Sequence, residues 1–99
     1  MILQSKQFEG KTFNKLILVK EDLSDKDFTN CMFNKCNLSE TNLTSASFTD
    51  CRFVDCNLSN CKLNNCNLQR ISFEESKILG INFSLCKRIL IFGREIYTF

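Results

Sequence analysis

The sequence contains no histidine, tryptophan or proline, and it has three glycines among 99 residues. The absence of histidine removes the commonest general base, the usual serine and cysteine protease arrangements and most zinc enzymes. We therefore expect a protein that is not an enzyme and that uses no cofactor or metal. Thirteen Lys and Arg residues balance 11 Asp and Glu residues, which gives no reason to expect nucleic acid or a membrane as a partner.

Long hydrophobic runs are also missing. No apolar stretch approaches the roughly 18 residues that a membrane-spanning helix requires. The first residues, MILQSKQFEGK, lack the charged start and the long apolar segment of a secretion signal. The length fits one small domain, and we expect this domain to be soluble and cytoplasmic.

A repeat of five residues runs through most of the chain. A large apolar residue stands at every fifth position from Leu3 to Phe83, comprising eight Phe, eight Leu and one Ile. We call this position the centre of each five-residue unit. An α-helix would scatter the centres around its axis, and a straight strand would send alternate centres to opposite faces. The chain must therefore turn once per unit and stack its units as a solenoid.

The residue types at the centres indicate how many units complete one coil. Centres that lie twenty residues apart are nearly alike: the series from Phe8 and Phe13 are mostly Phe, and the series from Leu3 and Leu18 are mostly Leu. Such matching is expected when like side chains stack in columns of constant width. The sequence thus predicts an all-β fold, a four-sided solenoid of about four coils.

The position two before each centre is a second, smaller inward register, and it holds every cysteine of the chain. The seven are Cys31, Cys36, Cys51, Cys56, Cys61, Cys66 and Cys86. Their spacings of five, fifteen and twenty match no CxxC metal pattern, and stacked parallel side chains cannot adopt the disulfide dihedral. We therefore expect free, buried thiols, and the odd number fits a reducing cytosol.

Charged residues take this second register in the first coil, at Lys6, Lys11, Glu21 and Lys26. We expect them to cap the open end, where inward charges prevent edge-to-edge stacking by another rod. Asn, Asp, Ser and Thr dominate the remaining positions. Their side chains bond to nearby backbone, so we expect them to supply the turns in place of Gly and Pro.

The units CNLSN, CKLNN, TNLTS and ASFTD resemble the A(D/N)LXX motif of the pentapeptide-repeat proteins, and this resemblance covers residues 1–86. It implies a right-handed quadrilateral β-helix. The best-known members are bacterial proteins that bind DNA gyrase and topoisomerase IV and confer quinolone or toxin resistance. The resemblance therefore implies a protein partner, with a type II topoisomerase as the named candidate. The alternative is a structural or interaction module without topoisomerase activity.

The segment Ile78-Leu79-Gly80-Ile81 resembles the glycine junction of the quinolone-resistance branch, although Gly80 could equally fill one tight corner. Some members of that branch are proposed to imitate DNA through a strongly acidic surface. Residues 1–86 here carry ten basic and ten acidic side chains. A neutral rod does not imitate phosphate charge, so this sequence departs from that mechanism.

The tail, residues 87–99, reads KRILIFGREIYTF and breaks the five-residue period. A segment this apolar must be covered or must cover something. Three interpretations remain open: a cap on the last coil, a homodimer contact, or the continuation of a longer rod. We take Ile89, Ile91, Phe92 and Tyr97 as the candidate partner-binding residues.

Overall fold

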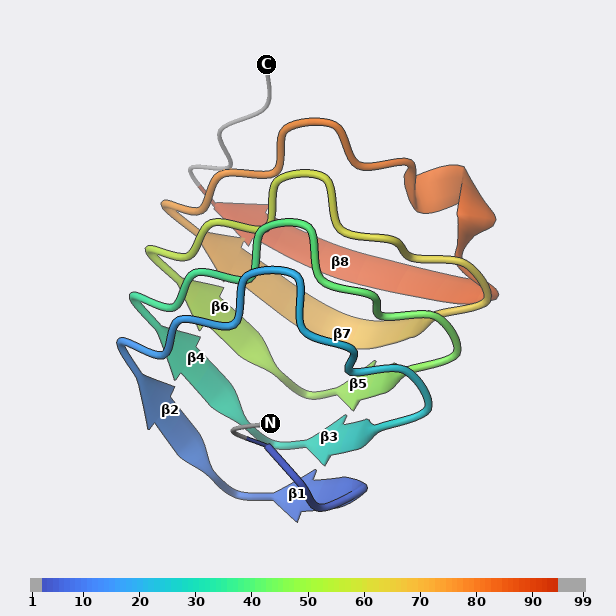
Figure 1. Ribbon diagram of the computed structural model, residues 1–99. Coiled ribbons are helices and arrows are strands. Elements are labelled where there is room, and N and C mark those ends of the chain that lie inside the picture. Colours follow the sequence, from blue (N-terminus) through green and yellow to red (C-terminus); the bar gives the residue numbers. More distant parts are fainter. Residues whose placement is uncertain (1–2, 95–99) are drawn as a thin grey trace.

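The computed structural model describes residues 3–94, which form a solenoid of coils stacked along one axis (Figure 1). The elements are β1 (Gln7–Glu9), β2 (Thr12–Asn14), β3 (Asp27–Thr29), β4 (Met32–Asn34), β5 (Ser47–Thr49), β6 (Arg52–Val54), β7 (Asn67–Glu74), the 3-10 turn η1 (Phe83–Leu85) and β8 (Arg88–Arg94). Strands pair in parallel with residues twenty positions later, such as Phe8 with Phe28. The predicted all-β solenoid with a twenty-residue coil is confirmed.

Each coil has four sides. The strands occupy two of them, in the columns that begin at Phe8 and Phe13. The other two sides are joined by isolated parallel bridges, such as Ile17 with Asn37 and Asp22 with Asn42. Strand β7 runs through the corner between the two strand columns, so these columns form one sheet in the order β1-β3-β5-β7-β6-β4-β2.

The centres form the core. Every centre from Leu18 to Ile78 is buried, and phenylalanines of successive coils stack face to face. The ring centroids of Phe28 and Phe48 are 4.8 Å apart, with an angle of 4° between the ring planes. Those of Phe33 and Phe53 are 4.9 Å apart, with an angle of 6°. Edge contacts between the two columns add to this packing. Like-on-like stacking thus fills a core of constant width, as the matching centres predicted.

The corners share one backbone conformation. From Gly10 to Gly80 every fifth residue, two after the centre, has a positive φ of 50° to 70°. On the two bridge sides, the side chains of Asp22, Asn37, Asn42, Asn57 and Asn82 each accept a hydrogen bond from the amide two residues later, at 3.0 Å for Asn37 and Ser39. These hydrogen bonds stabilise turns that Gly and Pro form in other proteins, as the composition predicted.

The first coil is only partly closed by charge. Lys26 is buried, and its Nζ donates to the carbonyl of Ser5 at 2.7 Å. Lys6 and Lys11 are exposed. Glu21 is half-buried. Lys6 and Lys11 precede β1 and β2, which have a neighbouring coil on one side only, so this register is covered at Lys26 and open to solvent at the other two lysines.

At the opposite end, β8 pairs in parallel with β7 as an additional partial coil. Asn67 pairs with Arg88, so the two paired residues are separated by one residue more than the usual twenty. The usual separation returns where Ile71 pairs with Ile91. Strand β8 has no residue opposite the corner residue Arg70, and this omission compensates for the extra residue. The first half of the tail thus lies on the last complete coil, and Figure 1 shows β8 in red along β7.

Candidate functional site

Exposed apolar side chains gather at the end of the rod that η1 and β8 form; we call this surface the apolar end. Of the five large hydrophobic residues exposed in the described part of the chain, only Ile17 lies elsewhere. The other four are Leu85, Ile89, Leu90 and Phe92. Apolar exposure concentrated in one coil marks an interaction surface more often than scattered single residues do.

The exposure has two structural causes. Ile89 and Ile91 pair with Leu68 and Ile71 and so continue inward positions, but β8 is the last strand described, and Ile89 is still 46% exposed. Leu90 and Phe92 instead take outward positions, where the preceding coil carries Gln69 and Ser72. Phe92 is 58% exposed. Apolar residues have therefore replaced polar ones on the outer faces of this coil.

The predicted partner-binding residues fall in three groups. Ile89 and Phe92 are exposed on the apolar end, whereas Ile91 is half-buried against the core. Tyr97 lies outside the described residues. The prediction missed Leu85 and Leu90, which lie on the same surface. Leu85 could have been found at the corner position two after Phe83, whereas counting by five does not reach Leu90 because the period breaks before Ile89.

A basic groove adjoins this surface. It has a volume of about 310 Å³ and lies on the outer face of the β5, β7 and β8 strands. The lining residues are Ser47, Thr49, Asn67, Gln69, Lys87 and Arg88. Lys87 and Arg88 are exposed, so the amino-terminal end of β8 carries two cations beside the apolar residues.

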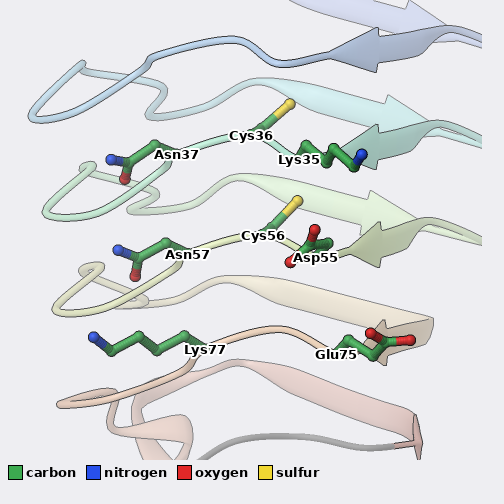
Figure 2. Close-up of a pocket in the computed structure, with 8 residues that line it drawn as sticks. All are labelled: Lys35, Cys36, Asn37, Asp55, Cys56, Asn57, Glu75 and Lys77. Carbon is green, nitrogen blue, oxygen red and sulfur yellow. The ribbon is translucent and has the colours of Figure 1, made fainter.

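A second groove, of about 450 Å³, crosses three coils on the side next to β4 and β6. Figure 2 shows its residues as a ladder, with Lys35, Asp55 and Glu75 at one corner and Lys77 below two asparagines. Two cations and two acids line this groove, so it has no net charge. The lining has no histidine, and both of its cysteines are buried.

Comparison with known proteins decides the family. The family description "Pentapeptide repeat region" matches residues 26–90, about two thirds of the chain. The chain belongs to the pentapeptide-repeat family. No protein with curated annotation matches it. Pentapeptide-repeat solenoids are structural and interaction scaffolds.

The cysteines of this pentapeptide-repeat protein are all free thiols, and all but the half-buried Cys86 are buried. Burial raises the pKa of Cys51 and Cys61 to about 11 and that of Cys66 to about 12. The described residues contain no group of three Cys, Asp or Glu side chains that could hold a metal ion. Burial makes these cysteines core residues of the repeat.

Cys36 and Cys56 interact across neighbouring coils, and Figure 2 shows both thiols pointing the same way. Each donates to a carbonyl in the preceding coil, Cys36 to Phe13 at 3.3 Å and Cys56 to Phe33 at 3.1 Å. The neighbouring Cys56 thiol lowers the pKa of Cys36. The contact with Cys36 and then burial raise the pKa of Cys56. The pair is therefore held within the core.

The pentapeptide-repeat rod also has no helix, within its described residues, that is long and apolar enough to cross a membrane.

Gly80 occupies a corner of the repeat with a φ of +70°, in phase with the other corners. A glycine at this position has a local structural role, whichever branch of the family the chain belongs to.

Proposed function

We propose that this pentapeptide-repeat chain is a non-enzymatic protein-binding module and that its partner docks on the apolar end. The observation that carries the proposal is the concentration of Leu85, Ile89, Leu90 and Phe92 on one end of the rod. Burying such a surface contributes roughly 25 cal/mol per Å², which offsets part of the cost of association.

The two ends of the rod differ in a way that supports docking at this one. The first coil carries exposed Lys6 and Lys11, together with buried Lys26. Charges on a terminal coil oppose the stacking of another chain. The apolar end has no charged side chain between Arg88 and Arg94 on its last strand. Association is therefore favoured at the carboxy-terminal end.

A second copy of the chain is one candidate occupant, through residues 87–99 with Ile89, Ile91, Phe92 and Tyr97 in the contact. Sedimentation of the intact chain at about 10 to 50 μM tests it. A homodimer should be disrupted by Phe92→Asp and preserved by Ile17→Asp, which changes another exposed apolar residue, outside the apolar end. An intact chain that stays monomeric at these concentrations rejects the homodimer.

A narrower candidate is a type II topoisomerase partner in a bacterial cytoplasm, with quinolone or toxin resistance as the outcome. Its support is the family and the resemblance of Ile78-Leu79-Gly80-Ile81 to the glycine junction. A DNA-gyrase supercoiling assay with and without quinolone tests this candidate directly. Unchanged gyrase activity at saturating protein would leave an interaction module with a different partner.

A further inference from the structure

Strand β8 leaves one backbone edge without a partner in the described part of the molecule. It is paired along seven residues with β7, and no other strand pairs with it. The corresponding edges at the other end belong to β1 and β2, which are three residues long. A seven-residue strand extends about 23 Å, enough to template another strand.

This edge lacks most of the features that usually prevent strand addition. Natural edge strands are kept short, or carry charges, prolines or bulges. Between Arg88 and Arg94 the strand reads Ile-Leu-Ile-Phe-Gly, without charge or proline. Its one irregularity is the register shift opposite Gln69 and Ile71. The exposed Ile89, Leu90 and Phe92 offer apolar contacts to an added strand on both faces.

Charge at the two ends of the strand specifies the partner. Lys87 and Arg88 are exposed at its beginning, and its last residue is Arg94. A second copy fits this pattern poorly, because an antiparallel pair of β8 strands centred on Ile91 places Arg88 opposite Arg94 at both ends. Like charges directly opposite each other destabilise a strand pair, whereas opposite charges stabilise it.

Building on the proposed function, we propose that β8 accepts an extended apolar segment of a partner protein, flanked by acidic residues, as a further strand. Backbone hydrogen bonds to the free edge would supply affinity. The exposed Lys87 and Arg88 at the beginning of β8 would select an acidic flank and set the segment's position. The partner class is thus an apolar β-segment between Asp or Glu residues.

The test uses the full chain and three synthetic probe peptides with a fluorescent label. All share the core Val-Ile-Val-Ile-Val; one has Glu-Glu at both ends, one has Lys-Lys, and one has Glu-Glu ends with alternate backbone nitrogens methylated. Binding is measured by fluorescence anisotropy in about 50 mM and about 500 mM salt. We expect the acidic peptide to bind at least about tenfold more tightly than the other two, with a smaller advantage at high salt.

Matched variants locate the contact. Arg88→Glu should remove the preference for acidic flanks, and Leu90→Lys should weaken binding of the acidic peptide by about tenfold or more. Ile17→Lys places the same charge at an exposed apolar position outside the apolar end and should leave binding unchanged. Circular dichroism of each variant shows that the solenoid is retained.

The outcomes separate this inference from the proposed function. Equal binding of the acidic and lysine-flanked peptides overturns the charge-selected partner, and equal binding of the methylated peptide overturns strand addition. No binding of the acidic peptide overturns the inference as a whole. A chain that dimerises through Phe92, and that the acidic peptide does not dissociate, makes a second copy the occupant; docking on the apolar end then stands.

Discussion

The side-chain oxygen of Asn60 lies where a Cβ on residue 80 would project, one coil away from Gly80 in the same corner column. Both residues have left-handed backbone, with φ of 61° for Asn60 and 70° for Gly80. Non-glycine residues occupy most other corners, so the backbone conformation alone does not require glycine at position 80. Glycine is required there because the Asn60 amide takes the space that a Cβ would need.

The first prediction compares the two corner glycines. Gly10 has φ +65° and open space around its missing Cβ, whereas a Cβ at Gly80 would collide with Asn60. We expect Gly10→Ala to lower the free energy of unfolding by about 1 kcal/mol through backbone strain. Gly80→Ala should cost about 0.5 to 1 kcal/mol more, because Asn60 must move. Urea denaturation measures both.

The double variant supplies the control for this comparison. In an Asn60→Ala background the excess cost of Gly80→Ala should disappear, since the colliding amide is gone. Equal costs for Gly10→Ala and Gly80→Ala in the natural background would show that Asn60 rotates away freely. The contact would then contribute nothing to the choice of glycine.

Much of this fold can be predicted from the sequence, because every fifth residue is buried and must therefore be apolar. The centres from Leu18 to Ile78 are buried without exception, and the stacked columns follow the predicted step of twenty. The buried thiols follow from the second register in the same way. Side-chain size and polarity at these positions leave the chain few alternatives.

The ends are less predictable, because a repeat pattern contains no information about missing neighbours. Lys6 and Lys11 share a register with buried Lys26 and are nevertheless exposed. In the tail, one extra residue before Ile89 breaks the period, so counting by five stops at Phe83. Backbone hydrogen bonding continues across that insertion, and β8 pairs with β7 after a local shift. A one-residue insertion therefore ends the five-residue sequence pattern but does not prevent β8 from pairing with β7.

The second prediction concerns the phenylalanine columns. Phe33 and Phe53 are fully buried and stack on each other, so Phe33→Ala and Phe53→Ala should each cost about 3 to 5 kcal/mol. Phe92→Ala, at an exposed position, should cost less than about 1 kcal/mol in the same urea titration. Three equal denaturation midpoints would contradict the packing described here.

The third prediction orders the cysteines by reactivity. Cys86 is the half-buried thiol, so a thiol reagent should label it first in the native protein and label the other six only slowly. Cys86→Ala should remove the fast phase, whereas Cys51→Ala should not. Denatured protein without reductant should yield seven thiols. A native protein that reacts at all positions at one rate would show that the core opens faster than it is labelled.

The last prediction concerns the pH dependence of an ion pair between coils. Arg70 Nε and Nη2 donate to Asp50 at 2.6 Å and 3.2 Å, and this hydrogen bonding lowers the pKa of the Asp50 carboxyl. A group whose pKa is lower in the folded state stabilises the fold above its unfolded value and loses that contribution as pH falls through the folded value. The pair should therefore stabilise the protein above about pH 4 and stop doing so in stronger acid.

Nuclear magnetic resonance titration of the Asp50 carboxyl measures this directly. Arg70→Gln should raise the pKa of Asp50 toward the ordinary value for aspartate, because the charged donor is lost. Arg52→Gln removes a different ion pair, the one with Glu74, and should leave Asp50 unchanged. Both partners of the Asp50 pair are well exposed, so salt should shrink the effect of Arg70→Gln. An Asp50 titration that is the same in both variants would mean that the pair does not persist in solution.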